Sequence, residues 1–205
     1  MMFRASSIGK LMASPDKAIL PVGAVTELDK MISQKLLNWH DDFDFNTLEK
    51  GRVCEDASID LYNELHDEFY IKNVERVTVG ELTGECDIID RSKSLVIDIK
   101  TAYSKKTYPL NLKLSSLYEW QLRAYMYLYD VDNAELAYCL VDTPDELING
   151  RDMQEWHTMH DVPLHLRVRT LRIERDATKE QYMLNRIALA HKYVTEQIEC
   201  LSKKA

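Results

Sequence analysis

The sequence predicts an α/β fold with a mixed central β-sheet flanked by helices. Three observations lead to this prediction: helical periodicity at both ends of the chain, a series of short alternating β-segments near its middle, and a further helix between the later strands. An order of this kind is typical of a sheet buried between helices. The 205 residues are the length of one such domain, and they contain no internal repeat or obvious linker.

The individual elements follow from periodicity and from their start and stop signals. Helices are expected over residues 5–13, 25–39, 47–67, 115–130 and 178–201. Ser14-Pro15-Asp16 would end the first helix, and Thr47 would cap the third. Strands are expected over 74–79, 84–89, 94–100, 135–141 and 164–174. The single domain over 1–205 would thus have an N-terminal helical part, 1–46, before its main part, 47–205.

The strand expected over 94–100 carries an acid and a base on one face. Because side chains alternate across a strand, Asp98 and Lys100 share a face, while Leu95, Ile97 and Ile99 share the other. By itself this pattern favours an incidental ion pair on a solvated edge strand, since matches this short arise often by chance. Other polar groups must converge on the strand before it becomes a candidate site.

Asp87 is the first such group. A tight turn at Asp90-Arg91-Ser92-Lys93 would join its strand to the next one and bring Asp87 close to a position opposite Asp98. Like charges directly across a strand pair are destabilising unless something neutralises them. Carboxylate oxygens suit Mg²⁺ or Mn²⁺, so this hairpin predicts a divalent-cation site.

Two more polar side chains are predicted on the buried faces of helices. Glu55 falls within the apolar arc of the helix over 47–67, where a carboxylate needs a partner. That partner is either a nearby lysine or the same metal site. Gln121 falls within the apolar stripe of the helix over 115–130, and a buried amide must be hydrogen-bonded. It is either a structural amide or a group that reaches the site.

In chain order these residues form Glu, then Gly-x-x-Asp, then Asp-x-Lys, then Gln-x-x-x-Tyr. This arrangement resembles the PD-(D/E)XK nuclease superfamily with its restriction-endonuclease-like core. More narrowly, it is similar to phage exonucleases related to lambda exonuclease and to the YqaJ-type viral recombinases. The matching segments are Arg4-Ala5-Ser6-Ser7, Glu55-Asp56-Ala57-Ser58, Asp87, Asp98-Ile99-Lys100, Gln121 with Tyr125, and Ile173-Glu174-Arg175-Asp176. The chain departs from lambda exonuclease at Glu85, where that enzyme has a serine assigned to binding the 5′ phosphate.

The resemblance implies a Mg²⁺-dependent exonuclease that hydrolyses linear double-stranded DNA, 5′ to 3′, in phage-type recombination or DNA processing. The implied catalytic residues are Glu55, Asp87, Asp98, Lys100, Gln121 and Tyr125. One or two Mg²⁺ or Mn²⁺ ions would be held by Asp87, Asp98, the carbonyl of Ile99, and Glu55 directly or through water. The expected DNA contacts are Arg4, Ser6, Ser7, Lys105, Lys106, Lys113 and Arg123. A run of charge is more often a solvated face, so the lysines are candidates only.

The remaining expectations concern partners and surroundings. The family includes ring-shaped trimers that encircle DNA, and a single-strand annealing protein is a candidate partner. Related nucleases with an iron–sulfur cluster have four cysteines in a fixed pattern. Here the cysteines are scattered and expected to be free, buried thiols: Cys54, Cys86, Cys139 and Cys200. His157 and His160 are expected at the surface. Arg167, Arg169 and Arg172 would belong to a subunit interface or to the DNA path.

Composition bears on the partner classes. The formal net charge of −8 disfavours a nucleic-acid partner at first sight. A nuclease needs only a locally positive groove, and the carboxylates that bind its metal ions make the total charge more negative. No apolar run approaches the ~20 residues that a membrane helix requires. The first residues lack the apolar stretch of a signal peptide, so a cytoplasmic protein without membrane contact is expected.

Three other interpretations stay open. The first is a site-specific or structure-selective endonuclease with the same fold. The second is a non-catalytic DNA-binding or assembly module, although the intact set of Asp87, Asp98 and Lys100 argues against lost activity. The third is a structural cation site in an unrelated α/β protein, which leaves Gln121 and Lys100 unexplained.

Overall fold

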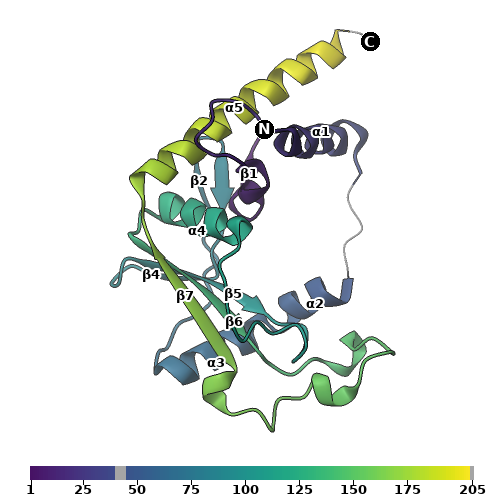
Figure 1. The fold of residues 1–205 in the computed structure, drawn as a ribbon, viewed down its shortest axis with the longest axis vertical. Helices are drawn as coiled ribbons and strands as arrows, with labels where there is room; N and C mark the ends of the chain where they lie inside the picture. The colour runs from purple at the N-terminus through teal and green to yellow at the C-terminus, as the bar shows by residue number, and fades with distance from the viewer. Residues whose placement is uncertain (40–44, 204–205) are drawn as a thin grey trace.

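A four-stranded mixed sheet forms the centre of the molecule (Figure 1). Its strands lie in the order β4 (Ile88–Asp90), β5 (Leu95–Thr101), β6 (Asn133–Cys139) and β7 (Val168–Glu174). The pair β5–β6 is parallel, and the pairs β4–β5 and β6–β7 are antiparallel. The structure is a computed structural model that describes residues 1–39 and 45–203. The mixed central sheet that the sequence predicted is confirmed.

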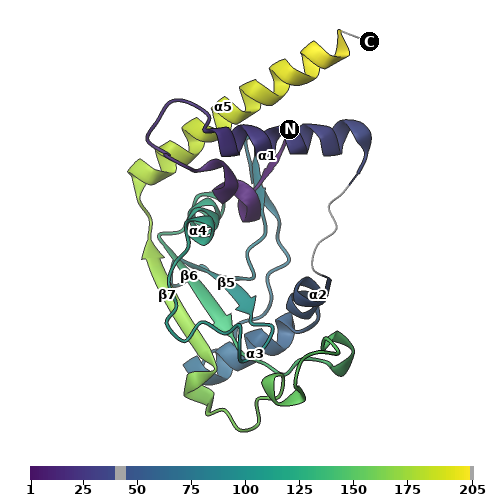
Figure 2. The same cartoon turned by 45° about the vertical axis from the view of Figure 1, so that its right-hand side comes forward.

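Helices cover both faces of this sheet (Figure 2). α4 (Ser116–Tyr129) packs on one face, and α3 (Glu55–His66) packs on the other. On β5, Val96 belongs to the apolar cluster on the α4 side, while Ile97 and Ile99 belong to the cluster on the α3 side. A strand buried on both faces is normally apolar along its length. Asp98, on the α4 face, is the buried charged exception.

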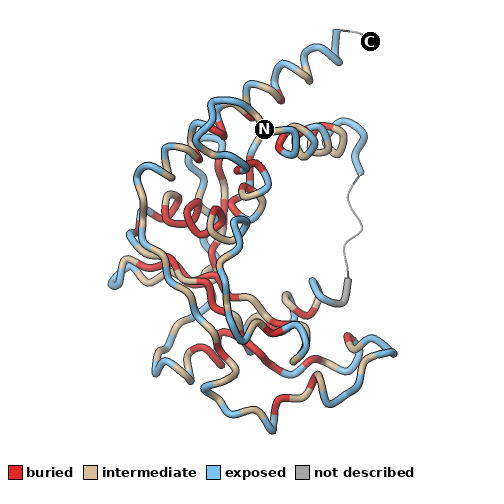
Figure 3. Tube along the Cα trace, in the orientation of Figure 1, coloured by how far each residue is buried: buried red, intermediate tan, exposed pale blue. Residues whose placement is uncertain are grey.

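A second, smaller sheet and three further helices complete the α4 side. This sheet contains β1 (Phe3–Arg4), β3 (Leu82–Gly84) and β2 (Val77–Val79) in that order. The helices are η1 (Ala5–Leu11), α1 (Val22–Leu37) and α5 (Ala177–Ser202). Their buried residues join those of α4 in one apolar cluster, and Figure 3 shows buried segments concentrated in α4 and the central strands. Among the described helices, none is long and apolar enough to cross a membrane.

The helix expected over 47–67 is two helices. α2 (Phe45–Val53) is followed by α3, with Cys54 between them at φ −99° and ψ 12°. The fully buried ammonium of Lys50 donates to the backbone oxygens of Tyr103 and Val141, while α3 turns to lie on the sheet. The break therefore follows from tertiary contacts that the continuous amphipathic pattern does not contain.

The strand expected over 84–89 is also interrupted. β3 ends at Gly84 in the small sheet, β4 begins at Ile88 in the central sheet, and residues 85–87 cross between the sheets outside any strand. Asp87 therefore lies at the crossing point of the two sheets. The segment expected as one strand over 164–174 likewise divides into the short helix η4 (Leu164–Leu166) and β7. Two more short helices, η2 (Asp145–Leu147) and η3 (Gln154–Trp156), lie in the loop before them.

Candidate active site

Asp87 and Asp98 lie opposite each other at the open end of the β4–β5 hairpin, as the sequence predicted. The register pairs Ile88 with Ile97, which makes Asp87 and Asp98 the next pair along the two chains. Asp98 is only 1% exposed. The Oδ2 atom of Asp87 accepts a hydrogen bond of 2.6 Å from the backbone N–H of Ile99. The side chain of Asp87 is thus tied to the backbone of the strand that carries Asp98.

Both oxygens of the Asp98 carboxylate have cationic or amide neighbours. Lys100 Nζ lies 2.6 Å from Oδ2, and Gln121 Nε2 donates to Oδ1 at 2.9 Å. The same amide nitrogen of Gln121 is 3.1 Å from the hydroxyl of Tyr125. Gln121 and Tyr125 come from consecutive turns of α4, and Asp98 and Lys100 come from one face of β5. The four predicted residues therefore form one contiguous polar network.

The charges of this network are unbalanced. Burial and the neighbouring Asp98 charge raise the pKa of Asp87 to about 7, although Lys100 and the Ile99 N–H act in the opposite direction. Burial alone would lower the pKa of Lys100, but the charges of Asp98 and Asp87 outweigh burial and raise it. Two carboxylates thus share one ammonium group in a largely buried place, and a further cation there would relieve their repulsion.

The residues around Asp87 and Asp98 fit a hydrated Mg²⁺ ion. Mg²⁺ is usually bound by one or two carboxylates, with waters and substrate phosphates in its other positions. The two aspartates supply such a pair. The N–H and C=O of one strand residue point to the same side, so the Ile99 carbonyl faces the side on which Asp87 lies. Within residues 1–39 and 45–203, no three His, Cys, Asp or Glu side chains form a closed metal cluster.

Glu55 lies close to this pair but has its own partner. It is the first residue of α3, and its Oε2 atom is 2.6 Å from Lys72 Nζ. Its charge still contributes to the raised pKa of Asp87. Of the two partners that the sequence left open for Glu55, the structure shows the lysine.

A cavity of about 420 Å³ brings the predicted residues together. It is lined by Asp87, Asp98, Lys100, Gln121, Tyr125, Arg4, Ala5, Ser6, Arg76, Thr83, Gly84 and Glu85. Ser7 is not among its lining residues, and its hydroxyl donates to the backbone oxygen of Arg4. Arg76 was not predicted from the sequence; its Nη2 atom is 3.0 Å from Glu85 Oε2. Because Val77 pairs with Gly84, Arg76 and Glu85 are the next pair along β2 and β3. Their opposite charges at paired positions are the sequence feature from which Arg76 could have been predicted.

The other basic residues expected to contact DNA lie outside the cavity lining. Lys105 forms an ion pair of 2.7 Å with Asp161, and Lys106 lies 3.8 Å from the centre of the Trp156 ring. Arg123 is 7% exposed and bonded to Glu119, which Lys179 also contacts. Lys113 is exposed. Arg123 is thus bound to Glu119 within the protein, and Lys105 and Lys106 contact Asp161 and Trp156 of a neighbouring loop.

Two expectations about exposure are wrong. His157 is fully buried, because its ring packs edge-on against Tyr103 and its Nδ1 atom is 2.9 Å from the Thr143 hydroxyl; His160 is exposed as expected. Cys200 is exposed near the end of α5, whereas the other three cysteines are buried and all four are free. Arg167, just before β7, and Arg169, within β7, donate to backbone carbonyls.

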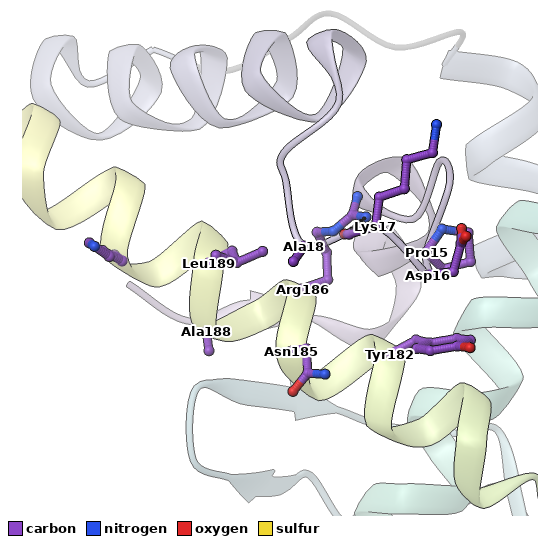
Figure 4. A pocket seen from close by; sticks show the side chains of 10 residues that line it. Pro15, Asp16, Lys17, Ala18, Tyr182, Asn185, Arg186, Ala188 and Leu189 are labelled. Carbon is purple, nitrogen blue, oxygen red and sulfur yellow. Dashed lines mark hydrogen bonds between the residues drawn. The ribbon is translucent and has the colours of Figure 1, made fainter.

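A second cavity, of about 430 Å³, lies against α5 and shares no lining residue with the first (Figure 4). The loop Pro15–Ala18 forms one wall, and side chains from Tyr182 to Lys192 form the other. The Arg186 guanidinium donates to the carbonyls of Leu11, Ala13, Ser14 and Lys17. Arg186 therefore holds the loop wall of this second cavity against α5. The network of Asp87, Asp98 and Lys100 lines the first cavity instead.

Comparisons with known proteins agree with this geometry. The model of the PD-(D/E)XK nuclease superfamily matches residues 21–200. The fold is similar to that of a phage-related exonuclease from Haemophilus somnus 129PT, with a TM-score of 0.90 and 25% identity over 98% of this chain and 96% of that one. It is also similar to an alkaline exonuclease, LHK-Exo, from Laribacter hongkongensis, with a TM-score of 0.66 and 14% identity over 100% of this chain and 95% of that one. The structure of LHK-Exo in complex with dAMP gives a TM-score of 0.71 and 15% identity over 99% of this chain and 92% of that one.

No curated protein sequence matches the chain. The superfamily model, however, spans most of its length, and both Asp87 and Asp98 lie within the matched part. The chain belongs to the PD-(D/E)XK nuclease superfamily.

Proposed function

We propose that this protein is a Mg²⁺-dependent exonuclease that degrades linear double-stranded DNA in the 5′ to 3′ direction. It would act in phage-type recombination or DNA processing in the cytoplasm, with Mn²⁺ able to replace Mg²⁺. The observation that carries the proposal is the placement of Asp87, Asp98 and Lys100 in one cavity at the end of the β4–β5 hairpin. The similarity over almost the whole chain to a phage-related exonuclease supports the choice of exonuclease over endonuclease.

The residues have separate tasks in this proposal. Asp87, Asp98 and the Ile99 carbonyl would hold one divalent cation, and Glu55 would join through water when Lys72 releases it. The bound cation supplies Lewis acidity, which lowers the pKa of water and offsets charge on the phosphate. Lys100 places a positive charge beside the reacting phosphate and orients the attacking water.

Residues of α4 and the N-terminal segment support this centre. Gln121 fixes the orientation of the Asp98 carboxylate through its 2.9 Å hydrogen bond, and the Tyr125 hydroxyl limits the rotation of that amide. Arg4 and Ser6, which also line the cavity, can donate hydrogen bonds to DNA phosphates. Ser7, Lys105, Lys106, Lys113 and Arg123 remain predictions from the sequence, as do a ring-shaped trimer and an annealing-protein partner.

The decisive experiment compares variants on defined DNA ends. Asp98→Ala and Lys100→Ala should each lower Mg²⁺-dependent hydrolysis of linear duplex DNA by at least about a thousandfold. The first variant removes a ligand of the cation, and the second removes the positive charge beside the reacting phosphate. Asp60→Asn, which alters an exposed carboxylate on α3, should keep wild-type activity. Full activity in either of the first two variants would contradict the assignment.

The choice of DNA substrates tests the type and direction of cleavage. A covalently closed circle should resist the enzyme, whereas linear duplexes with 5′-phosphoryl or 5′-hydroxyl ends should be degraded. A label in the 5′-terminal nucleotide should be released before a label at the 3′ end. Rapid nicking or linearisation of the closed circle would favour the endonuclease interpretation. Release of label from the 3′ end first would reverse the proposed direction.

A further inference from the structure

Residues 67–76 form an irregular segment, here called the strap, that runs from the end of α3 to β2. Three apolar side chains of the strap contribute no packing, since Phe69 is 93% exposed, Ile71 84% and Val74 81%, whereas Tyr70 packs against the apolar cluster on the α3 side. The residues between them point to the protein and make polar contacts. The Tyr70 hydroxyl donates to Asp90 at 2.9 Å, and Lys72 pairs with Glu55.

Asn73 binds both peptide groups that join Asp87 to the rest of the chain. Its backbone N–H donates to the backbone carbonyl oxygen of Asp87 at 2.7 Å, and its side-chain Nδ2 donates to the backbone carbonyl oxygen of Cys86 at 2.9 Å. Nδ2 is also 3.0 Å from the Tyr129 hydroxyl, and the Cys86 N–H donates to that hydroxyl at 3.4 Å. The Oδ1 atom of Asn73 accepts from the Glu75 N–H, which fixes the orientation of the amide.

These contacts matter because no strand ladder holds Asp87. The residue lies in the crossing between β3 and β4, so regular pairing begins only at Ile88. Its carboxylate is held near Asp98 against electrostatic repulsion. An unanchored crossing would relieve that repulsion by turning Asp87 away from Asp98. The Ile99 N–H holds the Asp87 carboxylate itself, and the contacts of Asn73 hold the two peptide groups that carry it.

We propose that Asn73 is a positioning residue for Asp87, and that Tyr129 supports it from α4. This inference rests on the proposed function, in which Asp87 and Asp98 hold a divalent cation. Asn73 itself does not line the cavity. Its role is to hold the two peptide groups so that the Asp87 carboxylate stays directed at Asp98.

The chain offers a matched control on the same strap. The Asn63 side chain also binds the strap, donating to the Tyr70 oxygen at 2.8 Å and accepting from the Tyr70 N–H at 3.0 Å. Asn63→Ala thus loosens the other end of the strap without removing a contact to residues 86–87. The experiment compares Asn73→Ala, Tyr129→Phe, Asn63→Ala and the wild type.

Two measurements separate positioning from a purely structural role. In DNA-free protein, Asn73→Ala should weaken Mg²⁺ affinity by about 10–100-fold, measured as the rise of the unfolding temperature with Mg²⁺ concentration. In the nuclease assay the same variant should need correspondingly more Mg²⁺ for half-maximal rate, with the KM for DNA changed by less than about threefold. Tyr129→Phe should shift both values in the same direction by a smaller factor. Asn63→Ala should lower the unfolding temperature yet leave both values at those of the wild type.

The outcomes are distinct. Wild-type Mg²⁺ dependence in Asn73→Ala, or an equal loss in Asn63→Ala, would overturn the inference. If Asn73→Ala does not fold, Tyr129→Phe decides the question by the same two measurements. If the wild type binds Mg²⁺ but does not hydrolyse DNA, the proposed function fails while the DNA-free titration still tests Asn73. A wild type that binds no Mg²⁺ would overturn both proposals.

Discussion

At the scale of single residues, Asp87 illustrates how a candidate active site reduces the stability of the protein. Its pKa in the folded protein is about 7, against an ordinary value of 3.8, because it is buried beside Asp98. The folded protein therefore binds this proton more tightly than the unfolded chain does. Between pH 4 and 7 the unfolded chain loses the proton first, so the free energy of unfolding falls as the pH rises through this range.

Replacing this carboxylate should stabilise the metal-free protein. In EDTA at pH 8, Asp87→Asn should increase the free energy of unfolding by about 2 kcal/mol relative to the wild type, and the gain should vanish near pH 4. Urea unfolding at several pH values measures it. Mg²⁺ should stabilise the wild type and have little effect on the variant. Parallel stability–pH curves for the two proteins would contradict the raised pKa.

The sequence predicted the residues whose positions depend on short-range geometry. Asp87 and Asp98 are joined by a tight turn, so their opposition follows from hairpin register, and Lys100 follows from alternation along β5. Asn73 and Lys50 could not be predicted in this way. Asn73 lies in a segment without periodicity, and the buried ammonium of Lys50 finds partners 53 to 93 residues away in the chain.

At the scale of elements, the types of helix and strand were predictable apart from the short helix η4, but the breaks within the segments 47–67, 84–89 and 164–174 were not. The segment 47–67 and the segment 84–89 each carry a continuous local pattern, and local pattern was the only information available. The breaks arise where the chain passes from one packing partner to another. At Cys54 the chain passes from α2, whose Lys50 is bound by neighbouring loops, to α3, which packs on the central sheet. At residues 85–87 it passes from the smaller sheet to the central one.

The break at residues 85–87 directly follows Gly84, where the close packing of β3, η1 and α4 requires a glycine. A Cβ atom on Gly84 would lie 2.8 Å from Ala5 Cβ, 2.8 Å from Leu128 Cδ1 and 3.0 Å from Tyr125 Cε1. Gly84→Ala should therefore lower the free energy of unfolding by about 1–3 kcal/mol, because β3 must move away from η1 and α4.

A matched glycine gives the control for this substitution. Gly51 lies within α2, and a Cβ atom there would meet nothing within 4 Å. Gly51→Ala should raise the free energy of unfolding by about 0.5–1 kcal/mol through helix propensity. Denaturant unfolding of both variants measures the difference. Equal effects of the two substitutions would show that crowding at β3 does not limit packing there.

At the scale of the whole molecule, the layered α/β architecture was predictable because each layer has its own local signature. The relation between the two ends of the chain was not predictable, since it depends on contacts more than 160 residues apart. Tyr193 on α5 donates to Asp29 on α1, and Arg186 donates to Ala13 and Ser14 in the segment after η1. The helix that closes the chain is therefore part of the same packed unit as the segment that begins it.

Arg186 provides the test of whether the chain unfolds as one unit. Its side chain is 1% exposed and donates to four backbone carbonyls between Leu11 and Lys17. Arg186→Met keeps the apolar stem but leaves those carbonyls without their donor, so we expect the free energy of unfolding to fall by about 2–4 kcal/mol. Lys192→Met, at a 73% exposed position on the same helix, should change it by less than about 0.5 kcal/mol.

Whether different probes report the same unfolding transition tests directly whether the chain is one domain. If residues 1–205 form one domain, circular dichroism and tryptophan fluorescence should report a single coincident unfolding transition in the wild type and in both variants, because the N-terminal helices share an apolar cluster with α4 and α5. Arg186→Met would then lower the midpoint for both probes equally. An early transition confined to one probe in Arg186→Met would instead mean that the N-terminal helices and α5 unfold separately from the central sheet.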